Sequence, residues 1–223
     1  MVASDNGELL TDTVYQRLAE RIFSGELPPG APLSVPALAV ELNVSRSPVR
    51  ESVQRLIYDG IAVHTPYAGA KVAAMDEESI FDVMRVREVL DGLAAQEATV
   101  RIGDEGLRVL AEIVERQSEL LEGAPDPQAE AALDLEFHTA IRAASGNAAL
   151  RDALHRLDAR AHLYRSGMWS VQRNREHALA EHRAILSALD AGDAVAAQAT
   201  ATAHVAALTV RMKRWLAATR PTP

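Results

Sequence analysis

The sequence contains no cysteine, and only two of its 23 basic residues are lysines. Without cysteine the chain cannot have a disulfide scaffold, a thiolate metal site or a cysteine nucleophile, so any metal must be held by His, Asp or Glu. No apolar run approaches the roughly 18 residues that indicate a membrane-spanning helix. The acidic, polar residues 1–10 do not resemble a secretion signal. We therefore expect a cytoplasmic protein that does not associate with a membrane.

Aromatic residues make up only 4% of the chain and β-branched runs are rare, whereas alanine is abundant, which predicts a mainly helical protein. The net charge of −8 argues against broad, non-specific binding to nucleic acid. The acidity is shared unequally, because residues 1–75 carry six basic and eight acidic side chains and residues 76–223 carry 17 and 23. The first part of the chain can therefore still present a small, local basic surface.

Proline and glycine are frequent up to about residue 72 and then become scarce. This shift predicts two domains, residues 1–75 and residues 76–223. In the first domain, apolar periodicity and the capping residues Ser34 and Ser45 predict three helices, over residues 11–24, after Ser34, and from Ser45 to about residue 59. Two β-prone runs follow, at 61–65 and 70–73. Three short helices and a hairpin are the order of a winged helix-turn-helix.

The second domain is predicted to contain helices only. Each break between them carries Gly, Pro or an Asx cap, and the connections are short, which is typical of antiparallel neighbours in a bundle. The expected helices span 76–100, 104–122, 128–144, 147–168, 174–189 and 193–218. The fold class is therefore mainly α, with an N-terminal winged helix-turn-helix followed by an all-α antiparallel helical bundle.

The third helix of the first domain opens with a motif suited to DNA. Arg46 and Arg50 are four residues apart and share one helix face. An arginine there can donate two hydrogen bonds to guanine O6 and N7 in the major groove. Ser45, Ser47 and the free amides of the first turn suit phosphate oxygens. The alternative is an ordinary solvated helix face, because charged runs are usually only surface.

Three further residues of this domain are candidates for the same interface. Arg55 and Lys71 are placed to reach the DNA backbone, and Gly69 would let the hairpin tip approach a minor groove. His64 has no partner pattern and is predicted to be structural.

The second domain contains four residues with metal-ligand spacing. Asp134 and His138 are four apart on one predicted helix, so their side chains point the same way. His182 and His204 are each eleven residues from Asp193, the centre of the turn between the last two helices. At about 1.5 Å per residue, both histidines lie roughly 16 Å from that turn and therefore at the same height. Three imidazole nitrogens and one carboxylate oxygen suit Zn²⁺ or Ni²⁺.

Other interpretations of these residues remain open. Each histidine can separately be a surface or core residue, and a metal-free protein could bind an acid directly through its histidines. Close by, His177 and Glu181 are candidate outer or substitute ligands. A metal-dependent hydrolase is the less favoured alternative, because the sequence offers no separate general base at recognisable spacing and no Ser/His/Asp pattern. We therefore expect that this protein is not an enzyme.

Residues 14–72 resemble the DNA-binding domain of GntR-family transcription regulators. The matching stretches are residues 22–30 (Ile22-Phe23-Ser24-Gly25-Glu26-Leu27-Pro28-Pro29-Gly30), residues 38–51, which include Ser45-Arg46-Ser47-Pro48-Val49-Arg50-Glu51, and residues 56–60 (Leu56-Ile57-Tyr58-Asp59-Gly60). The resemblance implies that Arg46 and Arg50 contact DNA and that the Gly69 hairpin is the wing. Where the family usually has a DNA-contacting arginine, near the start of the second helix, this sequence has Pro36.

The C-terminal region resembles the FCD ligand-binding domain of FadR-type GntR regulators. The matching pieces are Val86-Arg87-Glu88-Val89-Leu90-Asp91, Asp134-Leu135-Glu136-Phe137-His138, Ser145-Gly146-Asn147, Glu181-His182-Arg183-Ala184-Ile185-Leu186, and Gly192-Asp193 leading to His204. The resemblance implies that Asp134, His138, His182 and His204 hold a divalent metal whose open positions bind a small organic acid.

The same resemblance assigns two further residues to the effector pocket. Arg87 takes the position of a cavity-lining arginine that can pair with a second anionic group of the acid. Asn147 is a candidate for the pocket, although it more simply caps a helix. Asp91 replaces the family's more common glutamate, which is a mild change.

Together these features predict a homodimeric, ligand-responsive transcription regulator. Two reading helices must span the half-sites of a near-palindromic, double-stranded DNA operator, which requires a dimer.

Overall fold

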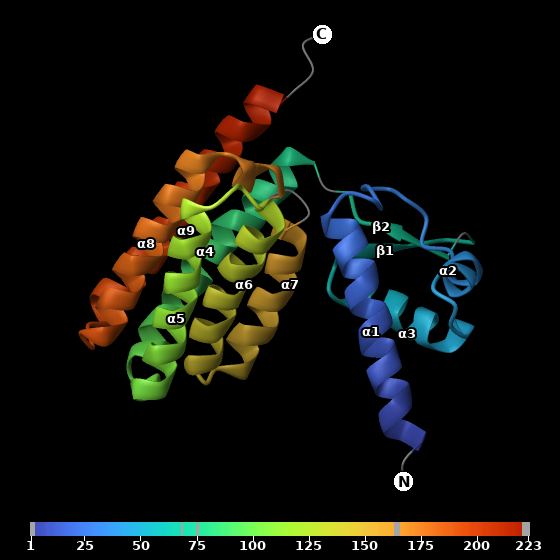
Figure 1. The fold of residues 1–223 in the computed structure, drawn as a ribbon, viewed down its shortest axis with the longest axis horizontal. Helices are drawn as coiled ribbons and strands as arrows, with labels where there is room; N and C mark the ends of the chain where they lie inside the picture. Colours follow the sequence, from blue (N-terminus) through green and yellow to red (C-terminus); the bar gives the residue numbers. More distant parts are fainter. Residues whose placement is uncertain (1–2, 68, 75, 163–165, 220–223) are drawn as a thin grey trace. The chain divides into compact units, whose positions relative to one another are not determined.

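The computed structural model describes residues 3–67, 69–74, 76–162 and 166–219 (Figure 1). The described residues form two compact units, one of those within 1–76 and 158–162 and one of those within 77–157 and 166–219. No sequence signal indicates that 158–162 belongs with the first unit. Among the described helices, none has the length and the apolar character needed to cross a membrane.

The first unit is the predicted winged helix-turn-helix. Its elements are α1 (Ala3–Phe23), α2 (Val35–Glu41), α3 (Arg46–Tyr58), β1 (Ala62–Thr65) and β2 (Gly69–Val72). The two strands pair antiparallel, with Ala62 opposite Val72, and form the wing. Helix α1 begins well before residue 11, where we expected it to start. Ser34 and Ser45 occupy the N-cap positions of α2 and α3, but neither side chain makes a capping hydrogen bond.

The core of this unit lies mainly between α1 and α3, which pack together. The apolar stripe predicted for α1 is buried at Val14, Leu18 and Ile22. The stripe of α3 is buried in the same cluster, at Val49, Val53 and Leu56. Because one face of α3 is fixed in this core, its opposite face is left for solvent or for a partner.

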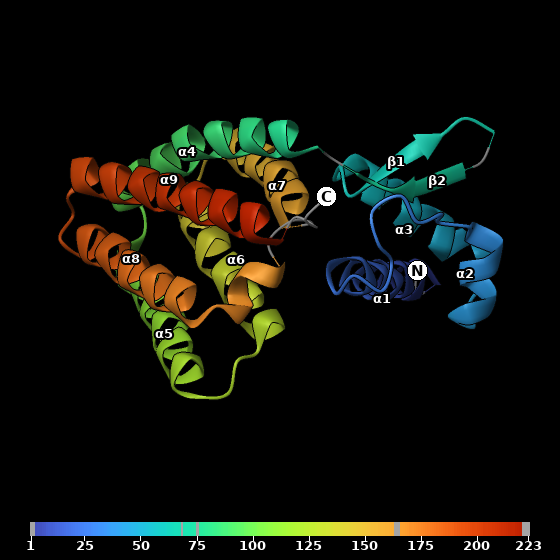
Figure 2. The same ribbon diagram turned by 90° about the horizontal axis from the view of Figure 1, so that it is seen from above.

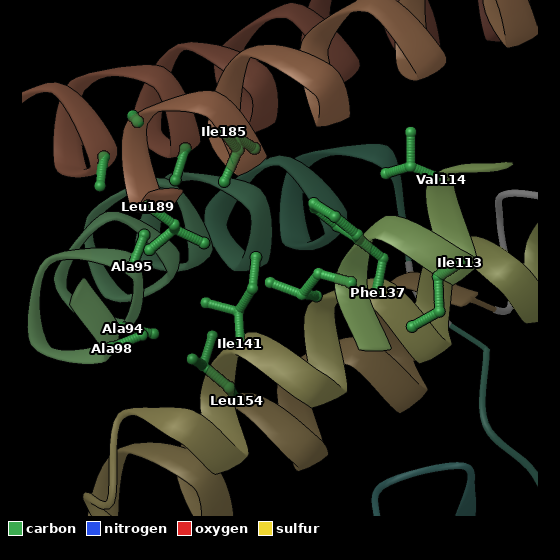
Figure 3. Packing of buried hydrophobic residues seen from close by; sticks show 14 of the residues in the cluster. Ala94, Ala95, Ala98, Ile113, Val114, Phe137, Ile141, Leu154, Ile185 and Leu189 are labelled. Atoms are coloured by element: carbon green, nitrogen blue, oxygen red, sulfur yellow. The ribbon is translucent and has the colours of Figure 1, made fainter. Parts of the chain in front are cut away.

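The second unit is the predicted helical bundle. Its elements are α4 (Glu77–Thr99), α5 (Gly103–Glu122), α6 (Pro127–Ala144), the part of α7 (Ala148–His162) up to residue 157, η1 (Ser166–Ser170), α8 (Gln172–Asp190) and α9 (Ala194–Thr219). Helix α9 lies between α4 and α8, and α5 packs against α6 and α8 (Figure 2). The core is built from small residues of α4 and larger ones of α5, α6 and α8, including Phe137 and Ile185 (Figure 3).

The helix that we expected over residues 147–168 is wrong at its C-terminal end. Helix α7 ends at His162, and Met168 lies instead in the short 3₁₀ helix η1, where it is buried. Residues 163–165 lie outside the described residues. Between residues 148 and 166 the sequence contains no glycine or proline, so nothing local marks the end of the helix.

Candidate metal centre and DNA-binding surface

Four buried side chains converge inside the bundle. Asp134 and His138 come from α6, His182 from α8 and His204 from α9, and their four potential ligand atoms all lie within 4.8 Å of one another. The Oδ1 atom of Asp134 is 3.7 Å from Nε2 of His138 and 3.6 Å from Nε2 of His182. Nε2 of His138 is 3.1 Å from Nε2 of His204. The structure therefore brings together the four residues that spacing had grouped.

Two of the imidazoles are oriented by acceptors on their outer side. Nδ1 of His182 is 2.9 Å from Oε1 of Gln117 on α5, and Nδ1 of His204 is 2.8 Å from Oε2 of Glu181 on α8. Because both partners are acceptors, each Nδ1 carries the proton and donates it. Each Nε2 then directs a lone pair into the cluster, which is the tautomer that a metal requires.

The third imidazole is kept neutral by its surroundings. Burial, and then the charges of His204, His182, Arg142 and Arg87, hold the pKa of His138 well below its usual value. Phe137 stacks on the ring of His182, with centroids 4.2 Å apart. The cluster therefore offers three oriented or neutral imidazoles and one carboxylate, which fits a divalent metal such as Zn²⁺ or Ni²⁺.

Of the two proposed outer ligands, only Glu181 lies at the cluster. Arg211 of α9 donates two hydrogen bonds to its carboxylate, at 2.6 and 2.7 Å. Partial burial opposes ionisation, but the hydrogen bonds from Arg211 and His204 lower the pKa of Glu181 to about 2. It is therefore a permanent anion behind His204. His177 is exposed on α8 and receives a hydrogen bond from Arg173 instead.

A buried arginine that sequence analysis missed lies one turn beyond His138. Arg142 donates from Nε and Nη2 to Oδ1 of Asp91, at 3.0 and 2.7 Å. Arg87, which is fully buried, places Nη2 3.2 Å from Oδ2 of the same carboxylate. Burial alone would raise the pKa of Asp91, but the charges of Arg142 and Arg87 lower it below its usual value. The four-residue spacing from His138 was the signal that could have revealed Arg142.

Asn147 is engaged as a helix cap. Its Oδ1 accepts from the backbone amide of Leu150 at the start of α7, and its Nδ2 donates to Glu97. It follows His138 by nine residues, at the far end of α6. These contacts are those of a helix cap, the simpler of the two interpretations of Asn147.

In the first unit, the start of α3 presents the four predicted DNA contacts to solvent. Ser45, Arg46, Ser47 and Arg50 are all exposed. Arg46 and Arg50 form no ion pair with any other described residue, so both guanidiniums are available. The hydroxyl of Ser47 donates to Glu51 at 3.1 Å, and a phosphate contact would replace that bond.

Arg55 differs from these residues because it is already engaged within its own unit. Its Nη1 donates to Asp12 at 2.6 Å, and its guanidinium lies over the ring of Tyr15, 4.2 Å from the centroid. These contacts tie α3 to α1. The predicted contact of Arg55 with the DNA backbone would have to compete with them.

A groove of about 340 Å³ runs between α3 and the wing, and its lining includes Pro36, Arg50, His64 and Gly69. The side chain of His64 is exposed here. Gly69 has a φ of +86°, a backbone angle that residues with a side chain rarely adopt. The space around its Cα is open. Tyr67 at the wing tip is fully exposed with a φ of +60°. A positive φ at a residue other than glycine is uncommon, so the backbone at the wing tip is unusual at Tyr67 as well as at Gly69.

Two protein families match this chain, one over each of its two units. Residues 10–72 match the family described as bacterial regulatory proteins, gntR family, and residues 82–207 match the FCD domain. The chain is 31% identical to the probable D-xylose utilization operon transcriptional repressor of Paenarthrobacter nicotinovorans, over 83% of this chain and 81% of that protein. It is 30% identical to an uncharacterized HTH-type transcriptional regulator of Streptomyces ambofaciens, over 93% and 86%.

Among solved structures, E. coli McbR/YncC has the same fold, with a TM-score of 0.81 at 22% identity, covering 93% of this chain and 98% of that one. These families and relatives are transcription regulators, and none of them supports the alternative of a metal-dependent hydrolase. The chain belongs to the GntR family of DNA-binding transcription regulators and carries an FCD domain after its winged helix-turn-helix.

Proposed function

We propose that this regulator senses a small organic acid through a divalent metal, Zn²⁺ or Ni²⁺, held by Asp134, His138, His182 and His204. The observation that carries the proposal is the convergence of four buried ligand atoms from three helices within 4.8 Å. Surface clusters of acidic groups often lack a metal, but all four of these residues are buried. Burying them together is costly unless they bind something.

The acid would reach the metal with a carboxylate. Four protein ligands leave open positions on a five- or six-coordinate metal, and carboxylate oxygens suit such positions. The residues of the chain orient this site, because Gln117 and Glu181 fix two imidazoles. Arg87 supplies a buried positive charge for a second anionic group of the acid.

DNA binding would require a homodimer in the cytoplasm that sets two copies of α3 into the half-sites of a near-palindromic operator. Arg46 and Arg50 would contact bases. Ser45, Ser47 and Arg55 would contact the backbone, and the hairpin at Gly69 would enter a groove as the wing. The acid would bind one arrangement of the bundle better than another, and the linker at residues 73–76 would pass this preference to the spacing of the two readers.

A direct test measures operator binding by fluorescence anisotropy with the promoter region of the protein's own gene. The affinity of the metal-loaded protein should change when a panel of small organic acids is added. A His138→Ala/His182→Ala variant should still bind the operator but no longer respond. An operator affinity that no acid changes would contradict the proposed sensing.

A second candidate is a metal-free acid sensor. The buried guanidiniums of Arg87 and Arg142 and the neutral imidazole of His138 are hydrogen-bond donors that can hold an acid without a metal. Metal analysis of protein prepared without a His-tag separates the two. The metal-dependent sensor predicts that acid binding is lost after chelation, and the metal-free sensor predicts that it persists.

A further inference from the structure

Gln54 continues, one helical turn further on, the face of α3 that carries Arg46 and Arg50. It follows Arg50 by four residues, so the two side chains are neighbours on the helix surface. Gln54 is exposed, and together with Arg50 it lines the groove between α3 and the wing. The side chain of Gln54 is therefore placed beside the two candidate base contacts, on the surface that meets DNA.

The polar side chains on either side of Gln54 are held by contacts within the unit. Glu51 accepts a hydrogen bond from Thr11 of α1, at 3.0 Å. Arg55 donates to Asp12, which is also on α1, at 2.6 Å. In contrast, the amide of Gln54 makes no hydrogen bond within the part of the chain that the structure describes. Both its donor and its acceptor are therefore available to a partner outside the chain.

The chemistry of a glutamine amide selects one base. The amide nitrogen donates hydrogen bonds and the amide oxygen accepts them. In the major groove, adenine presents the matching pair, an acceptor at N7 and a donor at N6. A phosphate oxygen would use only the donor of the amide, and guanine, with two acceptors, suits an arginine instead. Adenine is therefore the base that uses both groups of Gln54.

The spacing on α3 predicts where this adenine lies. Four residues of an α-helix rise about 6 Å along its axis. Because base pairs stack about 3.4 Å apart, this rise corresponds to two steps along the duplex. We infer that Gln54 determines the specificity of this regulator by binding an adenine in the major groove about two base pairs from the guanine that Arg50 binds. This inference rests on the proposed role of α3 as the reading helix and adds one base to each half-site.

The test is the selection of binding sites from a library of random-sequence duplex DNA by the full-length protein. Wild type should select a guanine and, about two base pairs away, an adenine in each half-site. Gln54→Ala should keep the guanine and lose the preference for adenine, which in wild type should be about 5- to 150-fold in affinity. Gln54→Glu should change the preference from adenine to cytosine, because a carboxylate accepts from N4 of cytosine.

The matched control is Gln16→Ala, which alters an exposed glutamine of α1 in the same unit and should select the wild-type site. Circular dichroism checks the folding of each variant. The inference is overturned if wild type selects no adenine at this distance. It is also overturned if Gln54→Ala binds all sequences more weakly by the same factor, as the loss of a phosphate contact would cause. In either case, loss of the guanine in Arg50→Ala would keep α3 as the reading helix, and an unchanged site in Arg50→Ala would contradict that role as well.

Discussion

His182 and His204 face each other across the α8–α9 hairpin, with ring centroids 4.8 Å apart. Each is eleven residues from Asp193, whose carboxylate accepts hydrogen bonds from the backbone amides of Val195 and Ala196 at the start of α9. The cap of one helix therefore sets the register that brings the two imidazoles together. Half of the candidate metal site depends on a turn that lies roughly 16 Å away along the helices.

Removing the metal should destabilise the bundle. Protein prepared without a His-tag should contain about one ion per chain, and chelation should lower its melting temperature because a ligand of the folded state is lost. The His138→Ala/His182→Ala variant should contain no metal, and its melting temperature should not respond to chelator. A wild-type protein without metal whose melting temperature is unchanged by Zn²⁺ or Ni²⁺ would exclude the metal site.

Gln117→Ala should weaken metal binding although Gln117 is not a ligand. It removes the acceptor that orients His182, and loss of such an outer contact typically costs about 10- to 100-fold in metal affinity. Competition with a chromophoric chelator measures the change. Gln128→Ala, which alters an exposed glutamine on α6, is the matched control and should leave the affinity unchanged.

Arg46→Ala and Arg50→Ala should each reduce operator affinity by about 1–3 kcal/mol without altering the fold, since each removes an exposed guanidinium that can read a base. Anisotropy with a labelled operator gives the affinity, and circular dichroism gives the fold. Arg108→Ala removes an equally exposed charge from α5 of the bundle and should have little effect. Unchanged operator binding in both reader variants would disprove the assignment of α3 as the reading helix.

Gly92→Ala should destabilise the bundle by about 1–3 kcal/mol, the usual cost of overpacking. A Cβ at Gly92 would overlap Oγ1 of Thr202 and lie 3.3 Å from the backbone oxygen of Gln198, where α4 meets α9. Thermal unfolding measures the loss. Adding Thr202→Ala removes the closest atom and should restore most of the stability, and a double variant as unstable as Gly92→Ala would show that the backbone contact dominates instead.

Tyr15→Phe should destabilise the first unit by about 1–3 kcal/mol. The Tyr15 hydroxyl donates to the buried carboxylate of Asp59 at 2.6 Å, and the variant leaves that carboxylate without this donor. The control is Tyr67→Phe, whose side chain is fully exposed and whose loss of a hydroxyl should not affect stability.

The same bond predicts a dependence on alkaline pH. Burial raises the pKa of Tyr15 above its usual value, and the hydrogen bond to Asp59 and the negative charge of that carboxylate raise it further. A raised pKa in the folded state gives stability that is complete below the unfolded value of about 10 and is lost as the pH rises toward the folded value. Urea unfolding from pH 7 upward should therefore show the difference between wild type and Tyr15→Phe shrinking only above about pH 10. A difference that shrinks at neutral pH would contradict this account.

Local sequence rules were sufficient to predict most of the helices, the wing and the grouping of the four candidate metal ligands. Regular helix geometry predicts the apolar stripe of α3 and the shared face of Asp134 and His138, which are four residues apart. The rise per residue also predicts that His182 and His204 lie at the same height in the α8–α9 hairpin. The end of α7 at His162 was missed because no residue there breaks a helix.

Buried charges were the other class of feature that the sequence concealed. Arg142 looks like one of many surface arginines on a helix, and only the three-dimensional structure shows it bonded to Asp91 on α4. The acceptor role of Gln117 on His182 was hidden for the same reason, since the partners are 65 residues apart.

The contacts between α1 and α3 restrict how this protein can be regulated. Tyr15 with Asp59, Asp12 with Arg55, and Thr11 with Glu51 join the two helices along much of the length of α3. A helix held at so many points keeps the geometry of its exposed face. If the proposed dimer and effector are correct, the effector would therefore change the separation of the two α3 helices and not the bases that each one reads.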